Sequence, residues 1–438
     1  MLADDTIAAI STPPGEGAIA VVRVSGPDVT RIVEQVFRGP KLSPRVATVG
    51  RIVDGEETVD EVVATFFAGP ASYTGEDVLE ISCHGGVIIS ARVLETILRA
   101  GARAAGPGEF TQRAFLNGKM DLTQAEAVMD LIRAQTPLAA RAAAEQLRGR
   151  IGEEISNIRD DLLGIVAHVE AYIDFPEEDI DPDTDATLRA RIDAVRNRIQ
   201  KLLATADDGR ILREGVRLAI CGRPNAGKSS LLNRLLGYDR AIVSPTPGTT
   251  RDTIEELLNL RGIPFRVVDT AGIRETPDSI EREGVRRARE VAEGADVVLH
   301  VIDSSDPEAV SAPPIVPNEL AVFNKSDLVA GAAAHRDALS ISCVTGDGID
   351  ALVDAIVERA RRHASGSRDS LAAINARHQA CLTRADAALA EAMDRFHEAP
   401  EFVAVHLRTA LDAVGDVIGV VDTEDILGRI FSSFCIGK

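Results

Sequence analysis

The 438-residue sequence has no tryptophan, and aromatic residues make up only 3% of it. Proteins that bind single-stranded nucleic acid commonly stack the bases on aromatic side chains, so we do not expect a base-stacking surface. Basic residues are also scarce, since 48 Lys and Arg stand against 68 Asp and Glu and the net charge is −20. Contact with many phosphates needs clustered Lys and Arg. An RNA partner would therefore need a local basic patch or a second protein.

Cysteine is infrequent, and long apolar runs are missing. The five cysteines are scattered, odd in number and without C-x-x-C spacing: Cys83, Cys221, Cys343, Cys381 and Cys435. This pattern indicates neither a disulfide framework nor a zinc site. No apolar run approaches the ~20 residues that span a bilayer, and the first residues lack the basic and apolar segments of a signal peptide. We expect a cytoplasmic protein without membrane contact.

The most informative segment is G-R-P-N-A-G-K-S-S at 222–230, which follows the apolar run 216–221 and precedes a Leu-rich helical segment. In this setting the pattern predicts a P-loop, whose backbone N–H groups face a phosphate at a helix N-terminus. Lys228 would neutralise the β- and γ-phosphates, and the Ser229 hydroxyl would bind Mg²⁺. A Gly-rich turn alone could be a plain loop, but the complete pattern argues against that. The predicted contacts are Asn225, Ala226, Gly227, Lys228, Ser229 and Ser230.

A second motif, N-K-S-D at 324–327, follows the apolar run 320–323 and identifies the base. Its carboxylate would accept hydrogen bonds from N1–H and the exocyclic amine of guanine, which adenine cannot donate. The wrong base would leave a buried acceptor unpaired, which costs free energy. N-K-x-D alone is common in surface loops, but after a P-loop it predicts GTP over ATP. The predicted contacts are Asn324, Lys325 and Asp327.

Two motifs between these are typical of the elements that sense the γ-phosphate. D-T-A-G at 269–272 follows a predicted strand, so Asp269 would hold the Mg²⁺ shell through water and the Gly272 N–H would sense the γ-phosphate. G-T-T-R-D at 248–252 supplies the switch threonine. Motifs at successive strand ends predict a Ras-like doubly wound sheet with the nucleotide at its carboxyl edge. The contacts predicted from D-T-A-G are Asp269, Thr270, Ala271 and Gly272.

The residue after Gly272 raises a mechanistic question. Many small GTPases place Gln there to orient the attacking water, but this chain has Ile273, which cannot do so. Hydrolysis then needs a carboxylate from elsewhere, a monovalent cation or a second subunit. Glu281 and the P-loop Asn225 are candidates, and the alternative for each is a solvated surface side chain.

The flanking sequence divides into an α/β part and a helical part. Residues 1–117 have mixed α/β character, with strands expected at 6–10, 18–24, 62–67 and 78–82 and helices at 29–37 and 88–100. Residues 118–210 and 366–438 are helical, with one helix expected at 185–206 and a capping box formed by Thr123 and Glu126. We predict a GTPase module, 211–365, inserted into one discontinuous helical domain. A helical repeat protein is the alternative, but no fixed period recurs.

The chain ends in F-S-S-F-C-I-G-K at 431–438. Terminal tails usually fray, but this one carries two Phe and an Ile, so we expect it to dock on the protein. Cys435 is either a functional thiol or an inert one in a packed tail, and the physical chemistry alone favours the inert thiol.

These residues resemble the bacterial tRNA modification GTPases of the MnmE (TrmE) type over essentially the whole chain. Within the GTPase module the resemblance rests on G-R-P-N-A-G-K-S-S-L-L-N at 222–233, P-G-T-T-R-D at 247–252, D-T-A-G-I-R-E at 269–275 and N-K-S-D at 324–327. Elsewhere it rests on P-P-G-E-G at 13–17, Y-T-G-E-D at 73–77, P-G-E-F-T-Q-R-A-F-L-N at 107–117, I-D-F-P-E-E at 173–178 and the terminal F-C-I-G-K.

The resemblance implies a homodimeric GTP hydrolase that acts with a flavoprotein, MnmG (GidA), as a heterotetramer. The pair would place a carboxymethylaminomethyl group on C5 of the wobble uridine of certain tRNAs. FAD would come only through the partner. The N-terminal domain would dimerise and bind 5-formyltetrahydrofolate, or a related tetrahydrofolate, as the one-carbon source. The implied folate contacts are Arg23, Glu80, Lys119 and Lys438.

The resemblance also implies that K⁺ takes the place of the missing Gln. The implied K⁺ ligands are Asn225, Ser244, Thr246 and Thr249, and the implied Mg²⁺ ligands are Ser229 and Thr250. Ser244, Thr249 and Thr250 would also contact GTP. Glu281 would orient the water indirectly, and Arg251 and Asp252 would belong to the switch that closes when two GTPase domains meet.

One element departs from the family pattern. The last guanine contact is usually S-A-K or S-A-R, but here it is Ser342-Cys343-Val344. A backbone N–H can still meet guanine O6, whereas the side chain that stacks over the base is lost, so we expect weaker affinity. A second function class remains open, a GTP-dependent assembly switch of the ribosome-biogenesis kind. The folate-like N-terminal domain and the C-I-G-K tail favour the modification enzyme.

Overall fold

The computed structural model describes residues 5–174, 185–238, 256–268, 292–310, 319–329, 339–362, 374–397, 399–420 and 424–438. The chain forms two compact units. The first contains Met1–Met129 and Ile418–Lys438, and the second contains Asp130–Val417. The domain boundaries at 117, 210 and 365 stay a prediction.

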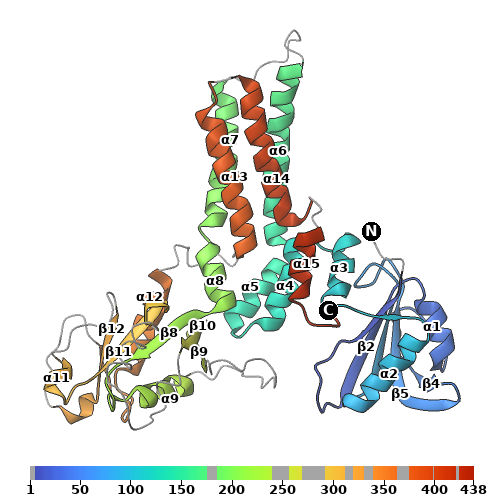
Figure 1. The fold of residues 1–438 in the computed structure, drawn as a ribbon, viewed down its shortest axis with the longest axis horizontal. Helices are drawn as coiled ribbons and strands as arrows, with labels where there is room; N and C mark the ends of the chain where they lie inside the picture. The colour runs from blue at the N-terminus through green and yellow to red at the C-terminus, as the bar shows by residue number, and fades with distance from the viewer. Residues whose placement is uncertain are drawn as a thin grey trace. The chain divides into compact units, whose positions relative to one another are not determined.

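The first unit contains a seven-stranded sheet in the order β3-β4-β5-β6-β2-β1-β7. All neighbouring strands are antiparallel except the parallel pair β1 and β7. Helices α1 (Val29–Val36) and α2 (Val87–Arg99) bury their apolar stripes against the sheet (Figure 1). The strands are β1 (Ile7–Ile10), β2 (Ile19–Ser25), β3 (Phe37–Arg38), β4 (Thr48–Asp54), β5 (Glu57–Phe67), β6 (Val78–His84) and β7 (Arg103–Ala104).

A smaller helical layer completes the first unit. It comprises α3 (Glu109–Leu116), α4 (Leu122–Arg133) and the C-terminal α15 (Glu424–Ser432). Residues from α4 and from the end of the chain share one apolar cluster, which includes Leu122, Met129, Phe431 and Phe434. Segments 300 residues apart in sequence are therefore held together by a common core.

The second unit contains a six-stranded sheet in the order β13-β12-β11-β8-β10-β9. Only the pair β9 and β10 is antiparallel. One large apolar cluster joins these strands to α8 (Ala206–Glu214), α9 and α12. The elements are β8 (Val216–Cys221), α9 (Lys228–Tyr238), β9 (Glu256–Leu260), β10 (Ile263–Val268), β11 (Val297–Asp303), α11 (Pro307–Val310), β12 (Leu320–Asn324), β13 (Leu339–Ser340) and α12 (Ile349–Arg362).

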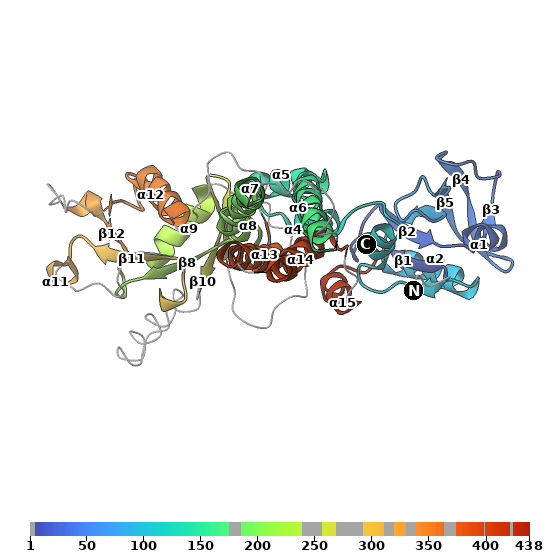
Figure 2. The same cartoon turned by 90° about the horizontal axis from the view of Figure 1, so that it is seen from above.

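Helices that precede this sheet in the sequence pack against helices that follow it. Figures 1 and 2 show α6 (Arg150–Asp174), α7 (Asp185–Leu203), α13 (Ala376–Asp394) and α14 (Pro400–Ile418) side by side. Arg196 of α7 pairs with Asp386 of α13 at 2.9 Å. The remaining helices of this group are α5 (Pro137–Leu147) and α8 (Ala206–Glu214). Within the described residues, no helix is both long enough and apolar enough to cross a membrane.

The helix expected at about 185–206 is confirmed as α7 (Asp185–Leu203). Two other sequence-based expectations about local structure are wrong. Thr123 does not cap α4. Asp121 accepts from Gln124 N at 2.9 Å while the Gln124 side chain accepts from Asp121 N at 3.0 Å, so the capping box begins two residues earlier. Strand β5 starts at Glu57, five residues before the expected position.

Candidate functional site

The loop 222–227 lies at the carboxyl end of β8 and leads directly into α9. Gly222 and Gly227 have φ angles of 145° and 96°. A side chain at Gly222 would overlap the carbonyl of Val301, and one at Gly227 would overlap the Asn324 amide. Only glycine permits these close approaches. The predicted strand, P-loop and helix are therefore present.

The phosphate end of the loop presents a helix N-terminus and an ammonium group. Lys228 Nζ donates to the carbonyls of Gly222 at 3.0 Å and Arg223 at 2.9 Å. Asn225 is exposed and has φ 63°, a left-handed conformation that Asn tolerates better than most residues. Ser229 and Ser230 are exposed on the first turn of α9. This combination fits a bound polyphosphate.

The base-recognition residues are already assembled. Asn324 is 2% exposed; its Nδ2 donates to Ala226 O at 2.9 Å, and its Oδ1 accepts from Cys343 N at 3.3 Å. One buried amide therefore joins the P-loop to the last predicted guanine contact. Ser342 Oγ donates to Asp327 Oδ1 at 2.6 Å, and the Asp327 side chain remains exposed. The structure thus brings Asn324, Asp327, Ser342 and Cys343 together.

Lys325 has a partner that the sequence did not reveal. Its Nζ lies 2.5 Å from Asp303 Oδ2, at the end of β11. Burial alone would raise the pKa of the Asp303 carboxyl, but hydrogen bonds from Lys325 and Ser305 outweigh it, so the pKa is lowered. The ion pair fixes the Lys325 side chain against the sheet edge.

A second group of predicted residues lies in the first unit. Arg23 donates through Nε and Nη2 to Glu80 Oε1, at 3.0 and 2.8 Å. Its Cζ lies 5.2 Å from the Tyr73 ring centroid and 5.6 Å from that of Phe110. Phe110 N in turn donates to the backbone O of Lys438 at 3.2 Å. Of the four predicted folate residues, Arg23 and Glu80 therefore pair directly, and Lys438 is connected to them through Phe110.

The fourth residue, Lys119, contacts a neighbouring loop. Lys119 Nζ donates to Pro70 O at 2.9 Å, and the Tyr73 that packs on Arg23 lies in the same loop. The structure therefore connects Lys119 to Arg23 through the loop of residues 70–73.

The C-terminal tail docks on the first unit, as expected. Ile436 forms a β-bridge with Pro107, and Gly108 N donates to Cys435 O at 3.3 Å. Gly437 O accepts from Ser11 Oγ at 3.0 Å. The Cys435 side chain is nevertheless exposed. No disulfide joins any of the five cysteines, all of which lie in the described part of the chain.

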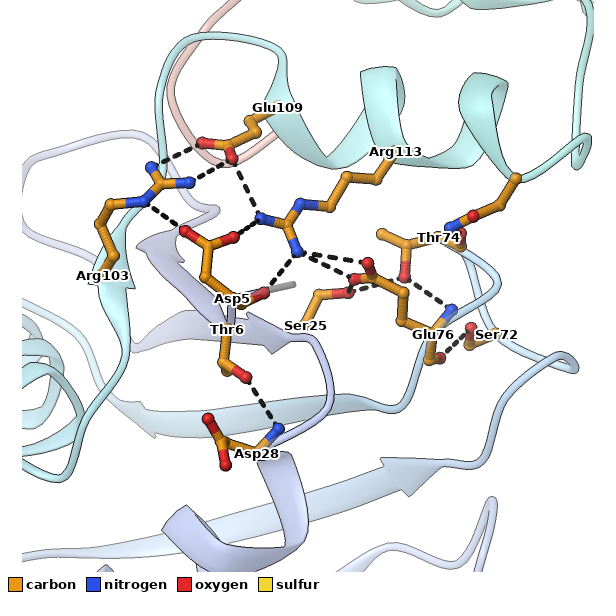
Figure 3. Close-up of polar contacts among 11 residues, drawn as sticks. Asp5, Thr6, Ser25, Asp28, Ser72, Thr74, Glu76, Arg103, Glu109 and Arg113 are labelled. Carbon is orange, nitrogen blue, oxygen red and sulfur yellow. Dashed lines mark hydrogen bonds and ion pairs between the residues drawn. The ribbon is translucent and has the colours of Figure 1, made fainter. Parts of the chain in front are cut away.

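A charged network below the tail anchors α3 (Figure 3). Arg113 is 4% exposed; it donates to Asp5 Oδ1 at 2.6 Å and pairs with Glu76 at 3.2 Å and Glu109 at 3.2 Å. Arg103 binds Asp5 and Glu109 from the other side. Sequence reasoning missed this network, because its members come from four separate segments. It fixes the helix whose N-terminus receives Lys438.

The network shifts the pKa values of its carboxyl groups. A hydrogen bond from Arg103 is the main cause of the lowered pKa of Asp5. Burial alone would raise the pKa of Glu109, but hydrogen bonds from Arg103, Gly106 N and Arg113 together lower it. Both carboxyls are therefore held in the ionised form.

Comparisons with known proteins bear on both sites. A family model described as the MnmE helical domain matches residues 122–435, and one described as the GTP-binding protein TrmE N-terminus matches residues 6–119. The tRNA modification GTPase MnmE of Akkermansia muciniphila is 50% identical, with 99% of each chain covered. Its namesakes from Geobacter metallireducens and Alkaliphilus metalliredigens are 46% and 44% identical, with 100% of each chain covered.

The chain belongs to the MnmE family of tRNA modification GTPases. The resemblance seen in the motifs is thereby confirmed, as are the multidomain fold and the prediction of a GTP-hydrolysing enzyme. Among solved structures, the G domain of the T. maritima FeoB iron transporter matches 33% of this chain and 98% of its own, at 26% identity and a TM-score of 0.26. That score is too low to carry an argument about fold.

Several residues with predicted roles lie outside the described residues, as does Ile273. They are Ser244, Thr246, Thr249, Thr250, Arg251, Asp252, Asp269, Thr270, Ala271, Gly272 and Glu281. Their roles in GTP, Mg²⁺ and K⁺ binding, in switching and in hydrolysis stay predictions.

Proposed function

We propose that this chain hydrolyses GTP in a K⁺-dependent cycle coupled to dimerisation of its GTPase domains. With the flavoprotein MnmG it adds a carboxymethylaminomethyl group to C5 of the wobble uridine, position 34, of certain tRNAs. The observation that carries the proposal is the buried Asn324 amide, which joins the P-loop to the base-recognition loop beside the exposed Asp327. Discrimination between guanine and adenine needs this fixed arrangement.

Two cations are part of the proposal. Ser229, on the first turn of α9, would hold Mg²⁺ together with Thr250, and Asn225 would hold K⁺ together with Ser244, Thr246 and Thr249. The exposed, left-handed Asn225 fits this role, because its side-chain oxygen is available at the phosphate end of the loop. Bound there, K⁺ would supply positive charge to the transferred phosphoryl group.

A tetrahydrofolate in the first unit is the third cofactor. Arg23, packed on Tyr73 and Phe110 and paired with Glu80, offers a cation and a carboxylate beside aromatic rings. Such a group fits the polar edge and the flat ring of a pterin. Lys119 and Lys438 would add charge for the glutamate tail. A pure assembly switch has no use for such a site, so the modification enzyme is the favoured function.

The experiment is reconstitution of uridine modification from the purified protein, an MnmG protein with its FAD, tRNA, GTP, 5-formyltetrahydrofolate, glycine and NADH. Glycine supplies the carboxymethylamino atoms, and NADH supplies the two electrons that reduce the one-carbon unit to the methylene level. Mass spectrometry of the digested tRNA should reveal carboxymethylaminomethyluridine, and omission of either GTP or the chain should abolish it. Arg23→Ala should reduce the product while GTP turnover stays within about twofold of the wild type, because Arg23 and the nucleotide residues lie in separate units. GTP turnover without any modified uridine would support the assembly switch.

A further inference from the structure

Arg234 lies on α9, six residues after the P-loop lysine, and reaches the last base-recognition loop. Its Nε donates to Cys343 O at 3.1 Å and its Nη2 donates to Val344 O at 2.9 Å. One guanidinium fork therefore holds two successive carbonyls. Arginine suits this contact because its donors are fixed in one plane.

This contact determines where the N–H groups of the loop point. In a planar trans peptide the C=O and the following N–H point in opposite directions. Because Arg234 holds the carbonyls of Cys343 and Val344, the N–H groups of Val344 and Thr345 must point away from α9. Thr345 N confirms this, since it donates to Ser342 Oγ at 3.1 Å.

Ser342 Oγ in turn donates to the Asp327 carboxylate, the group expected to read the base. The loop face opposite Arg234 is therefore the face that carries Asp327. Val344 N–H points to this same side, one peptide before Thr345. The Val344 side chain itself is 80% exposed, so it contributes little to holding the loop.

We propose that Arg234 is a positioning residue for guanine recognition, one that directs the Val344 N–H toward O6 of the base. The proposal rests on the proposed binding of GTP at this site. Arg234 would act through the two carbonyls that it holds, and not through a direct contact with the nucleotide.

The test compares GDP with 6-thioguanosine 5′-diphosphate, which keeps N1–H and the exocyclic amine but has sulfur, a weak hydrogen-bond acceptor, in place of O6. Arg234→Ala should weaken GDP binding about three- to tenfold, the effect of one misplaced hydrogen bond, and weaken the analogue less than about twofold. The KM for GTP should rise by the factor seen for GDP with kcat unchanged, because base contacts are equal in the ground and transition states. Arg261→Ala is the matched control. Arg261 packs on Tyr238 at the end of α9 and pairs with Asp354 on α12.

A second variant separates the effect of the two-donor geometry of the guanidinium from the effect of its positive charge. Arg234→Lys keeps the charge but not the two parallel donors, so GDP should again bind at least threefold more weakly. The proposal would be overturned if either variant bound GDP as tightly as the wild type does. It would also be overturned if Arg234→Ala weakened the binding of both nucleotides equally. Failure of the wild-type protein to bind GDP would instead contradict the proposed function.

Discussion

The base-recognition loops and the α3 network are held by different kinds of interaction. The base-recognition loops are held mainly by side-chain hydrogen bonds to backbone groups, beside the ion pair of Lys325 and Asp303. The α3 network instead surrounds one buried guanidinium, that of Arg113, with three carboxylates. The exposed Asp327 carboxylate accepts from the neutral Ser342 hydroxyl, which leaves its charge for a ligand, whereas the carboxylates of the α3 network are paired with arginines. The two regions should therefore respond differently to mutation and to pH.

The largest effect is expected from Arg113→Ala. Glu76 loses its arginine partner, although Arg103 still binds the other two carboxylates. A buried group left without its hydrogen-bond partner typically costs about 1 to 3 kcal/mol in the free energy of unfolding. Scanning calorimetry of the full chain should show the transition of the first unit at lower temperature, with GDP affinity unchanged. Arg92→Ala removes an exposed pair with Glu57 and should leave the transition almost unchanged. Equal stability of the two variants would contradict the assignment.

Asp327→Asn should weaken GDP binding strongly and change the stability of the fold little. It removes two charge-assisted hydrogen bonds to guanine, so GDP affinity should fall about 100-fold. The unfolding transition should move little, because the side chain is exposed. Asp350→Asn, at an 80% exposed side chain on α12, is the control for lost surface charge. If GDP affinity fell less than tenfold, or if the free energy of unfolding fell by a similar amount, Asp327 would stabilise the loop more than it binds guanine.

The pH dependence should separate the regions further. Asp5 and Glu109 have lowered pKa values in the folded state, so the stability they contribute is complete above their unfolded pKa values of 3.8 and 4.5. It is lost as pH falls through the folded values. Calorimetry between about pH 5 and pH 3 should therefore show destabilisation of the first unit, with a shallower slope in Arg103→Ala, because Arg103 does most to lower the pKa of both carboxyls. Identical slopes in the variant and wild type would exclude the network as the cause.

The features that sequence predicted best are contiguous motifs. The strand, loop and helix around 216–238 are encoded by neighbouring residues, so the P-loop geometry followed from its pattern. The base-recognition residues were predicted for the same reason. The capping box was assigned wrongly because Asp121 and Thr123 both suit an N-cap, and sequence alone does not decide between them.

The features that sequence missed depend on tertiary contacts. Lys325 meets Asp303 only because β11 and β12 are neighbours, and Arg234 reaches a loop 109 residues away. The partners of Arg113 lie on separate segments of the chain, so no contiguous pattern indicated that network.

The central claim is that a cation does the work of the missing Gln, and it is tested most directly by GTP turnover in KCl and in NaCl at equal ionic strength. Sizing of the GDP–aluminium fluoride complex in both salts would accompany the rates. We expect strong stimulation by K⁺, together with K⁺-dependent association of the GTPase domains. Asn225→Gly, which keeps the left-handed backbone, should lose that stimulation. Equal slow rates in both salts would contradict the claim.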